Sequence, residues 1–282
     1  MYCSPSRSEA QLGEVPGSCY DNNELIAIAN AYNNVINKNS ICKDTGISKD
    51  DVCIKSCNLI DINLTSLELH KELSSKLDKL CKSDMCWTDL DFIKTIKDKN
   101  LRNSILHFTF KPKFNSLSSK AKTNAWFNTF NINQIMDQYQ ELYKDTFTFL
   151  GAQPSDYSKV GKINWDIIKK KNNIGIIFNT DNHKQPGRHW VSVFIDNVNK
   201  KVDYFDSLGN KPNKNISSFL KHFKTYNFTI NNIEHQKQNE NCGVYSCYFI
   251  IQRLKGLSFE QITKRIITDK MMTDYRSFLF RP

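Results

Sequence analysis

Three short apolar stretches, following one another between residues 174 and 207, limit the folds open to this chain more than any other feature. They read "IGIIFNT" (174–180), "HWVSVFIDN" (189–197) and "VDYFDS" (202–207). The second alternates with a period of two and the third runs into the turn "SLGN", so each predicts a β-strand. Helical periods surround them without a regular strand–helix alternation. This irregular mixture predicts an α+β fold and argues against a parallel βαβ array.

Apolar residues recur at helical spacing on both sides of these strands. Ahead of them, helices are expected in "NNELIAIANAYNNVI", in "TSLELHKELSSKLDKLC" and in "WTDLDFIKTIKDKN". The second opens with Thr65 and has Glu68 three residues later, which is a capping-box pattern. A further helix is expected in "NAWFNTFNINQIMDQYQELY", with Asn131 as its cap. After the strands, "NISSFLKHFKTY", "CGVYSCYFIIQRLKG", "SFEQITKRI" and "DKMMTDYRSFLF" predict helices, the second of them stopped by Gly256, and "FTINNIEHQ" predicts an extended segment.

The distribution of charge suggests two domains. Residues 1–100 carry 12 Lys and Arg against 15 Asp and Glu, whereas the rest of the chain carries 27 against 14. We predict a helical accessory domain over residues 1–110, with an irregular arm over its first 20 residues. The basic, serine-rich segment 111–122 is expected to be a linker, and 123–282 to be the second domain. A basic domain favours polyanions or acidic proteins as partners, although a lysine-rich genome gives the same charge.

Composition narrows the class of protein further. Hydrophobic residues make up 39% and aromatic residues 12%, as in a folded globular protein. No apolar run is long enough to span a membrane, and the N-terminus shows no apolar core of a secretory signal. The nine cysteines have irregular spacings, so reduced thiols inside the cell are expected. Structural zinc usually has tighter pairs than the C-x3-C and C-x4-C of Cys53, Cys57, Cys81 and Cys86, so no metal is expected.

Two cysteines lie five residues apart in "QKQNENCGVYSCYFIIQRLKG" and have different surroundings. Cys242 follows a polar run and stands where the helical period begins, so the amides and dipole of a helix N-terminus favour its thiolate. Gly243 leaves room for a substrate backbone to come close. Cys247 lies among apolar and aromatic residues, which keep a thiol protonated and inert. The sequence therefore predicts Cys242 as a nucleophile and Cys247 as a core residue.

A cysteine nucleophile needs a base, and the base needs a partner that orients it. Among six histidines, His189 opens a strand after a loop that contains Pro186 and Gly187, and a residue at the mouth of a strand projects into a cleft. A single histidine is more often an exposed or satisfied side chain, so a second signal is needed. Asp206 closes the next strand and can orient the imidazole if the two strands are neighbours. Asp203, earlier in that strand, is its competitor.

An amide side chain precedes the nucleophile. Gln236 lies six residues before Cys242. Its amide and the Cys242 backbone N–H are therefore candidates for donating hydrogen bonds to the oxyanion of a tetrahedral intermediate. Gln238 is nearer in sequence, and spacing alone leaves it open as the donor.

The combined pattern "HW" (189–190), "YFDSLGN" (204–210) and "Q-x5-CG" (236–243) resembles the catalytic core of the adenain and SUMO-deconjugating cysteine peptidases. "AWFNTFNINQIM" is similar to the W-L-x(4)-I segment of that family. The resemblance covers about residues 120–260 and implies a papain-like or adenain-like core, with a central mixed sheet flanked by helices. It implies a catalytic triad of His189, Asp206 and Cys242, with Gln236 as the oxyanion donor. It also implies that Trp126, Trp190 and Gly243 bind the substrate.

One viral branch of the family is more similar still. "IIFNTDNHKQPGRHWVSVFID", "EHQKQNENCGVYSCYFI" and "ITDKMMTDYRSFLFRP" look like the polyprotein proteases of large nucleocytoplasmic DNA viruses, among them the African swine fever virus enzyme. That enzyme has an extra helical domain ahead of its core, and an Asn where this chain has Asp206. The resemblance implies cleavage after Gly-Gly-type motifs in viral structural precursors, in the host cytoplasm (viral factory) and in the virion.

Two other functions remain open at this stage. The first is a deconjugase of SUMO or ubiquitin-like modifiers. The second is a nucleic-acid-binding or scaffold module with a structural cysteine. Such a module would not need all four catalytic residues at family spacing, so their presence argues against it. No cofactor is expected apart from DNA as an activator, since adenoviral relatives use DNA. The basic run "KKKNN" (169–173) is a candidate nucleic-acid contact, with solvated basic surface as the alternative.

Overall fold

The computed structural model describes residues 2–10, 15, 18–38, 59–114, 125–238 and 240–281. It divides the chain into two compact units, Met1–Lys111 and Pro112–Pro282. Most of the expected linker at 111–122 lies outside the described residues, so the domain limits at 110 and 122 stay predictions. Within the described part of the chain, every helix is too short or too polar to cross a membrane.

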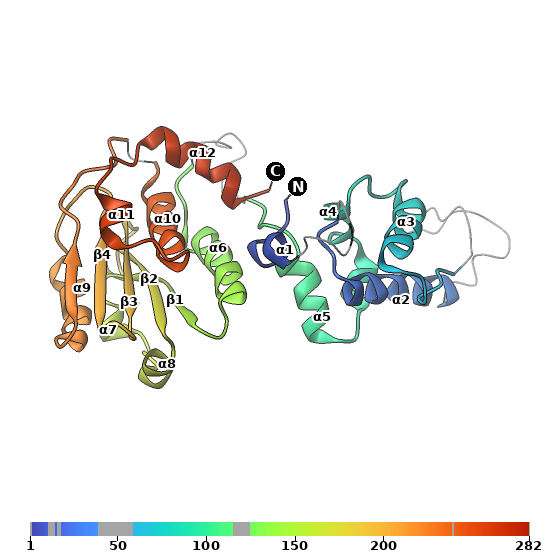
Figure 1. Ribbon diagram of the computed structural model, residues 1–282, viewed down its shortest axis with the longest axis horizontal. Helices are drawn as coiled ribbons and strands as arrows, with labels where there is room; N and C mark the ends of the chain where they lie inside the picture. The colour runs from blue at the N-terminus through green and yellow to red at the C-terminus, as the bar shows by residue number, and fades with distance from the viewer. Residues whose placement is uncertain are drawn as a thin grey trace. The chain divides into compact units, whose positions relative to one another are not determined.

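The first unit is helical, and the apolar faces of its two long helices contribute much of its core. Its elements are α1 (Pro5–Ala10), α2 (Asn22–Lys38), α3 (Ser66–Leu77), α4 (Asp84–Trp87), the 3-10 helix η2 (Asp91–Thr95), α5 (Lys99–Asn103) and the π-helix η3 (Ser104–Phe108) (Figure 1). The capping box is confirmed, since Thr65 and Glu68 exchange side-chain and backbone hydrogen bonds at the start of α3. The buried apolar residues of α2 and α3 are Leu25, Ile28, Ala29, Ala31, Tyr32, Ile36, Leu69, Leu73 and Leu77.

Two expectations for this unit are wrong. The single helix expected in "WTDLDFIKTIKDKN" is broken into α4, η2 and α5. Asp98 accepts hydrogen bonds from the backbone N–H groups of Asn100 and Leu101, so it caps a new helix where the expected one would continue. Part of the arm expected to be irregular over residues 1–20 is also helical, because Pro5–Ala10 form α1.

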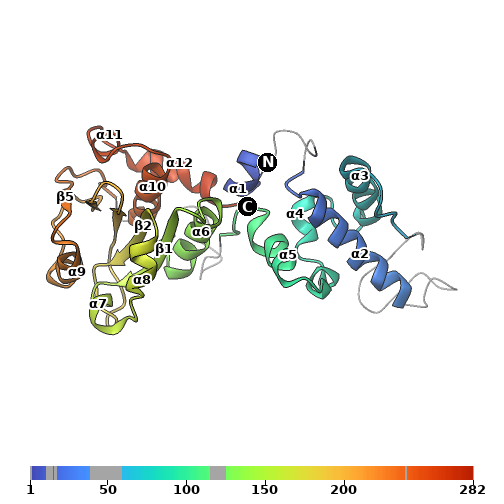
Figure 2. The same ribbon diagram turned by 60° about the horizontal axis from the view of Figure 1, so that its bottom comes forward.

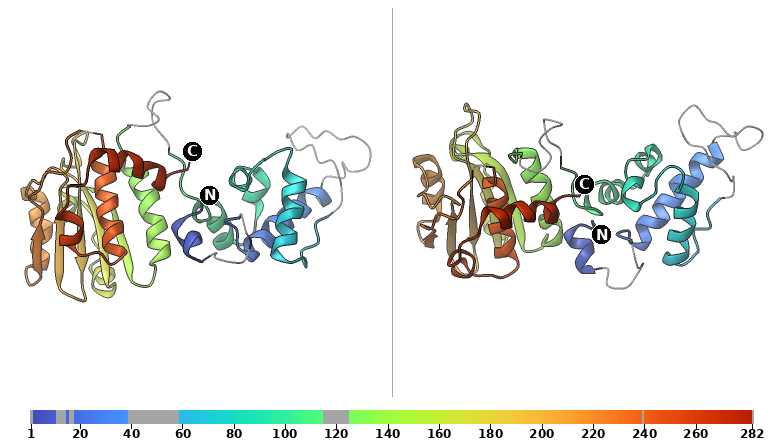
Figure 3. Two further views of the ribbon diagram at one scale, coloured as in Figure 1. Left: turned by 45° about the horizontal axis from the view of Figure 1, so that its top comes forward. Right: turned by 90° about the horizontal axis from the view of Figure 1, so that it is seen from above.

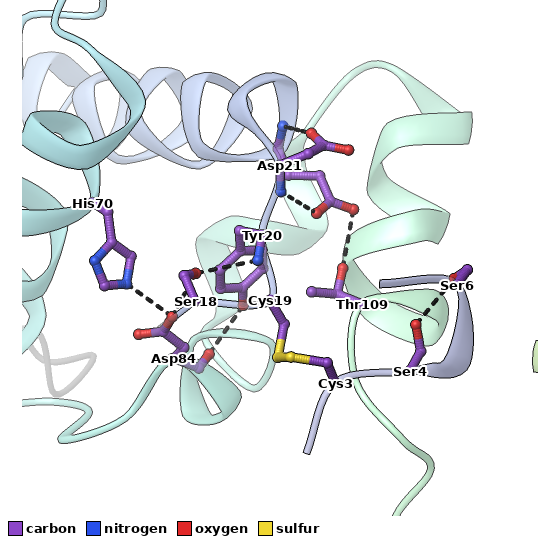
Figure 4. The surroundings of a disulfide bond; sticks show 11 residues. Cys3, Ser4, Ser6, Ser18, Cys19, Tyr20, Asp21, His70, Asp84 and Thr109 are labelled. Carbon is purple, nitrogen blue, oxygen red and sulfur yellow. Dashed lines mark hydrogen bonds and ion pairs between the residues drawn. A yellow bond between two sulfur atoms is a disulfide. The ribbon is translucent and has the colours of Figure 1, made fainter. Parts of the chain in front are cut away.

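The cysteines of the first unit correct another expectation. Instead of reduced thiols, the structure contains the disulfides Cys3–Cys19 and Cys81–Cys86. Figure 4 shows the first of them beside Tyr20, which is fully buried and donates from its hydroxyl to the backbone carbonyl of Asp84. Irregular spacing in sequence did not reveal these pairs, because only the fold brings the partners together. Cys53 and Cys57 lie outside the described residues.

The second unit is built on a mixed five-stranded sheet of order β1-β2-β3-β4-β5. β1 pairs with β2 and β4 with β5 in parallel, whereas β2–β3 and β3–β4 are antiparallel. The α+β core with a central mixed sheet is therefore confirmed, and the three predicted strands are present. The strands are β1 (Phe147–Pro154), β2 (Asn173–Asn179), β3 (Trp190–Asp196), β4 (Lys201–Phe205) and β5 (Asn227–Ile230).

β1 was not predicted, and its backbone explains why. Gly151 has a φ of +91°, and the pairing with β2 shifts register between Phe149 and Ala152. A bulge of this kind interrupts the alternation by which a strand is recognised in sequence. Only two of its eight residues are buried, so its sequence lacks a continuous apolar run as well.

Helices cover both faces of the sheet (Figures 1 and 2). Ile177 of β2 packs toward one face and its neighbour Ile176 toward the other, as the pleat of a strand requires. The first face carries α6 (Thr129–Leu142), α10 (Cys242–Leu254), α11 (Phe259–Thr263) and α12 (Asp269–Leu279). The second carries α7 (Tyr157–Val160), α8 (Trp165–Lys170), α9 (Lys214–Leu220) and the 3-10 helix η4 (Lys221–Phe223).

α10 is central to the first face and lies beside α6 (Figure 3). Its residues are buried along most of its length, and Phe249 stacks on Phe205 of β4 with ring centroids 4.8 Å apart. The helix ends at Leu254, and the expected stop, Gly256, follows two residues later with a φ of +89°. The cap of α6 is Asn128, and the expected cap Asn131 is instead its capping-box partner. Because α10 is buried along most of its length on this face, its N-terminal end is held in a fixed position.

Candidate active site

Three predicted residues meet where β3, β4 and α10 come together. His189 precedes β3, Asp206 follows β4, and Cys242 is the first residue of α10. His189 Nε2 lies 2.6 Å from Asp206 Oδ1, because β3 and β4 are antiparallel neighbours. The Cys242 side chain interacts with the same imidazole and raises its pKa; because Nε2 faces Asp206, Nδ1 is the ring nitrogen left for the thiol. This arrangement places a base between an acid that orients it and a nucleophile.

The electrostatics of His189 fit an ion pair with the thiol. Burial lowers the pKa of the imidazole, but its hydrogen bonds to Asp206 and Cys242, together with their charges, outweigh burial and raise the pKa to about 9. His189 is therefore protonated near neutral pH, and an imidazolium beside a thiol favours the thiolate. A helix N-terminus favours the same anion.

The carboxylate of Asp206 is itself held by the backbone around it. Asp206 Oδ1 accepts a hydrogen bond from the backbone N–H of Leu208, at 2.9 Å. The Asp206 N–H donates to Asn231 Oδ1 and the Asp206 carbonyl accepts from Asn231 Nδ2, both at 2.8 Å. Asn231 is buried, and nothing in the sequence signalled its role beyond its place within an expected extended segment. It fixes the end of β4 on which the triad depends.

The competitor Asp203 belongs to a different interaction. Its carboxylate accepts hydrogen bonds from Arg253 Nε, at 2.8 Å, and from the hydroxyl of Thr229. Asp203 lies inside β4, whereas Asp206 lies beyond its end. The structure therefore pairs Asp206, and not Asp203, with His189.

Gln236 is buried and its orientation is fixed. Its Oε1 accepts a hydrogen bond from the hydroxyl of Ser207 at 2.6 Å, and its Nε2 donates to the backbone carbonyl of Gln238. Because a primary amide carries two N–H groups, one remains to donate to an oxyanion. Gln238 is exposed and contributes only its backbone here. Ser207 was not singled out from the sequence, although it directly follows Asp206.

Cys242 is buried, with 2% of its surface exposed, and so are Gln236 and Asn241 in the polar run before it. The polar character of this run therefore does not place all of it at the surface, since these two residues are buried. A glycine is also required at position 243 for a steric reason that the sequence did not suggest. A Cβ there would lie 2.7 Å from the Cβ of Phe127. Its missing side chain makes room for the segment next to Trp126.

The two expected substrate-binding tryptophans border a pocket of about 710 Å³. Trp126 is 48% exposed, whereas Trp190 is buried and donates from Nε1 to the Phe127 carbonyl at 2.8 Å. One indole of this pocket is thus open to solvent, and the other is held in place by a hydrogen bond. The remaining walls come from the residues on both sides of Trp126, from the end of β1 and from the β2–β3 loop that leads to His189.

A buried arginine adjoins the nucleophile and was not singled out from the sequence. Arg276 of α12 contacts both residues before Cys242 and the segment before Trp126. In the sequence, Arg276 is visible only as a basic residue in an expected helix, which does not indicate a role at the site. Among the residues that the structure describes, no group of three or more His, Cys, Asp and Glu side chains is arranged to hold a metal ion.

Comparisons with known proteins agree with this geometry. Residues 99–281 match the model of the Ulp1 protease family, C-terminal catalytic domain. The chain is 31% identical to a putative thiol protease of Acanthamoeba polyphaga mimivirus, over 99% of this chain and 93% of that protein. It is 26% identical to a cysteine protease of African swine fever virus, over 77% and 90%. The crystal structure of an African swine fever virus protease superposes with a TM-score of 0.61 at 22% identity, covering 84% of this chain and 94% of that one.

Proposed function

This chain belongs to the Ulp1 protease family and is a cysteine peptidase, and we propose that it is an endopeptidase that matures the structural precursors of a large DNA virus by cleaving after Gly-Gly-type motifs. The observation that carries the proposal is the hydrogen-bonded set of Asp206, His189 and Cys242 beside a pocket bordered by two tryptophans. Its relatives in mimivirus and African swine fever virus support the viral setting.

The chemistry follows from the positions of the side chains. The Cys242 thiolate attacks the substrate carbonyl, and the oxyanion accepts hydrogen bonds from the Cys242 backbone N–H and from Gln236 Nε2. The His189 imidazolium then gives its proton to the leaving amine, so the C–N bond breaks and a thioester remains. Neutral His189 removes a proton from water, which attacks the thioester and releases the acid. Asp206 keeps the imidazole in one orientation through both steps.

The Gly-Gly preference rests on the two tryptophans. The carbonyl of Phe127 fixes Trp190, and Phe127 directly follows Trp126, so the spacing between the two indoles is set by one segment. We expect the substrate backbone to pass between the indoles, where a side chain larger than hydrogen would collide. Residues that precede the glycines would enter the pocket of about 710 Å³, whose polar lining includes Asn128 and Arg188.

A matched peptide panel tests this proposal. The wild-type chain, Trp126→Ala and Cys242→Ser are assayed on peptides that contain Gly-Gly, Gly-Ala, Ala-Gly or Ala-Ala before the scissile bond. We expect the wild type to cleave Gly-Gly peptides at least about 10-fold faster than the others, since a steric clash at one subsite costs about 1–3 kcal/mol. Trp126→Ala should narrow that ratio. Equal cleavage of all four peptides by the wild type would refute the Gly-Gly specificity while leaving the peptidase intact.

A SUMO or ubiquitin fusion tests the alternative that the chain is a deconjugase. One relative in African swine fever virus is named a SUMO-1 cysteine protease, which gives this alternative a specific basis. Cleavage of the fusion at a rate comparable with that of viral precursors would favour it.

DNA, proposed as an activator through the basic catalytic half, is added to parallel reactions at low salt, where phosphate contacts are strongest. The proposed locations, the host cytoplasm (viral factory) and the virion, are tested by labelling infected cells and purified particles.

A further inference from the structure

A buried arginine lies at the point where the nucleophile and the substrate cleft adjoin. Arg276 of α12 is 9% exposed. Its Nε donates to Asn241 Oδ1 at 2.9 Å, its Nη1 to the Ala125 carbonyl at 2.7 Å and its Nη2 to the Glu240 carbonyl at 2.8 Å. The guanidinium also stacks over the ring of Phe127, with its carbon 4.9 Å from the ring centroid. Both the edges and a face of this side chain are therefore engaged.

The partners of Arg276 belong to the two segments that the reaction needs. Glu240 and Asn241 directly precede Cys242, and their conformation decides where the Cys242 backbone N–H points. Ala125 directly precedes Trp126. α12 packs against α10, which lets one side chain reach both segments (Figures 1 and 2). A single guanidinium thus ties the start of α10 to the wall of the cleft.

The charge of Arg276 is as relevant as its hydrogen bonds. Burial lowers the pKa of this guanidinium to about 10, while the charges of Cys242 and Glu240 oppose the shift. Arg276 therefore stays cationic near neutral pH and favours an anionic sulfur. His189 also favours the thiolate, but only while it is protonated, whereas Arg276 keeps its charge throughout the reaction cycle.

We propose that Arg276 is a positioning residue of this peptidase: it holds the Glu240–Asn241 turn so that the Cys242 N–H faces the oxyanion, and its buried charge supports the Cys242 thiolate. It touches no reacting atom, so it acts through Cys242. Other titratable or charged groups on the elements around the start of α10 include His189, Asp206, His235, Glu240, Tyr245 and Asp269, together with two exposed ion pairs, Lys237–Glu234 before α10 and Lys270–Asp274 on α12.

The chain supplies a matched control in Arg253 at the other end of α10. Arg253 is also largely buried, donates from Nε to Asp203 Oδ2 at 2.8 Å and from Nη1 to the Leu257 carbonyl, and stacks over the ring of Phe194 at 4.9 Å. It resembles Arg276 in burial, hydrogen bonding and ring contact, but its hydrogen bonds lie far from the turn before Cys242. Substitution of either arginine is therefore expected to lower the stability of the protein, but only substitution of Arg276 is expected to affect Cys242.

The test measures Cys242 alkylation by iodoacetamide as a function of pH in the full chain, with the modified peptide identified by mass spectrometry. It needs no substrate, so it gives a result even if the Gly-Gly proposal fails. In Arg276→Gln, alkylation at about pH 6 should fall about 10-fold relative to wild type and recover at about pH 9, where thiolate forms without help. Arg253→Gln should leave the pH profile unchanged while lowering the melting temperature. Equal profiles for Arg276→Gln and wild type would overturn the inference.

Arg276→Lys separates charge from geometry and covers the case in which Arg276→Gln does not fold. Lysine keeps the charge, but its single ammonium nitrogen cannot reproduce the planar fork by which Nε, Nη1 and Nη2 of Arg276 reach three separate acceptors. Its alkylation profile should stay within about 3-fold of wild type, while kcat for peptide cleavage falls about 10-fold with KM little changed, because an oxyanion donor is misplaced. Wild-type kcat in a folded Arg276→Lys would show that Arg276 has no positioning role.

Discussion

Cys242 and Cys247 lie five residues apart on one helix, and both are buried, with 2% and 0% of their surfaces exposed. Burial therefore does not separate them. Cys242 stands at the first position of α10 beside His189, whereas Cys247 lies among apolar side chains, and burial there raises the pKa of its thiol far above the usual range. The comparison shows that polar partners and place on a helix, more than access to solvent, make a cysteine reactive.

The sharpest test of this comparison removes each thiol in turn. Cys242→Ser should lower kcat/KM by about 10³-fold or more, because a hydroxyl beside an imidazole tuned for a thiol is a poor nucleophile. Cys247→Ala should keep activity within a few-fold and lower stability by about 1 kcal/mol, since it leaves only a small cavity. Peptide cleavage and thermal melting check the two effects. A comparable loss of activity in both variants would contradict the distinction.

The two carboxylates of the β4 region provide the next test. Asp206→Ala should lower kcat/KM about 100-fold, because His189 loses the partner that orients and charges it. Asp206→Asn should be milder, since an amide oxygen still accepts from the ring. Asp203→Asn should instead destabilise the fold by about 3 kcal/mol, because it removes the charge that Arg253 is paired with in a buried site.

Activity and denaturation assays at low temperature distinguish these outcomes. Asp203→Asn serves as the matched control, since it changes a buried carboxylate of the same strand region without touching His189. Full activity in Asp206→Ala would exclude that residue from the triad.

Two histidines, the partly buried His189 and the fully buried His235, should respond to pH in opposite directions. His189 has its folded-state pKa raised to about 9, so its contribution to stability is complete below its unfolded pKa of about 6.5 and is lost as pH rises through 9. Burial lowers the pKa of His235, whose Nδ1 accepts from the backbone N–H of Ile267, so the stability of that neutral form is lost as pH falls below about 6.5. Melting temperature as a function of pH should therefore decline on both sides.

Two variants test which histidine causes each decline in melting temperature. Asp206→Asn should weaken the alkaline decline, and His235→Gln, whose amide oxygen can still accept from Ile267, should weaken the acid decline. Profiles that keep both limbs in both variants would show that other groups control the pH dependence.

The sequence predicted that His189, Asp206 and Cys242 would come together, because strand ends and helix starts are local signals. His189 and Asp206 flank strands with clear apolar patterns, and Cys242 begins a helix with a clear period. Asn231, Ser207 and Arg276 were missed, since each acts through a contact between segments far apart in the chain. Their types are common on protein surfaces, and only the fold brings them to the site.

The same reasoning explains the errors in the fold. β1 lacks an unbroken apolar alternation because of Gly151, and the pairing of Cys3 with Cys19 depends on the packing of the first unit. The helix expected at 87–100 failed at Asp98, where a side chain that bonds the backbone starts a new helix. Local polar contacts thus defeated a pattern based on apolar residues alone.

The smallest effects are expected at the glycines near the two ends of α10. A Cβ at Gly243 would lie 2.7 Å from the Phe127 Cβ, whereas a Cβ at Gly256 meets nothing within 4 Å but requires a φ of +89°. Gly243→Ala should cost about 1–3 kcal/mol of stability and shift Phe127, whose carbonyl holds Trp190, so kcat/KM should fall several-fold. Gly256→Ala should cost about 1 kcal/mol through backbone strain and leave activity unchanged. Melting and peptide cleavage measure both, and a Gly243→Ala variant with wild-type activity would show that the cleft segment can move away from α10 without disturbing the catalytic residues.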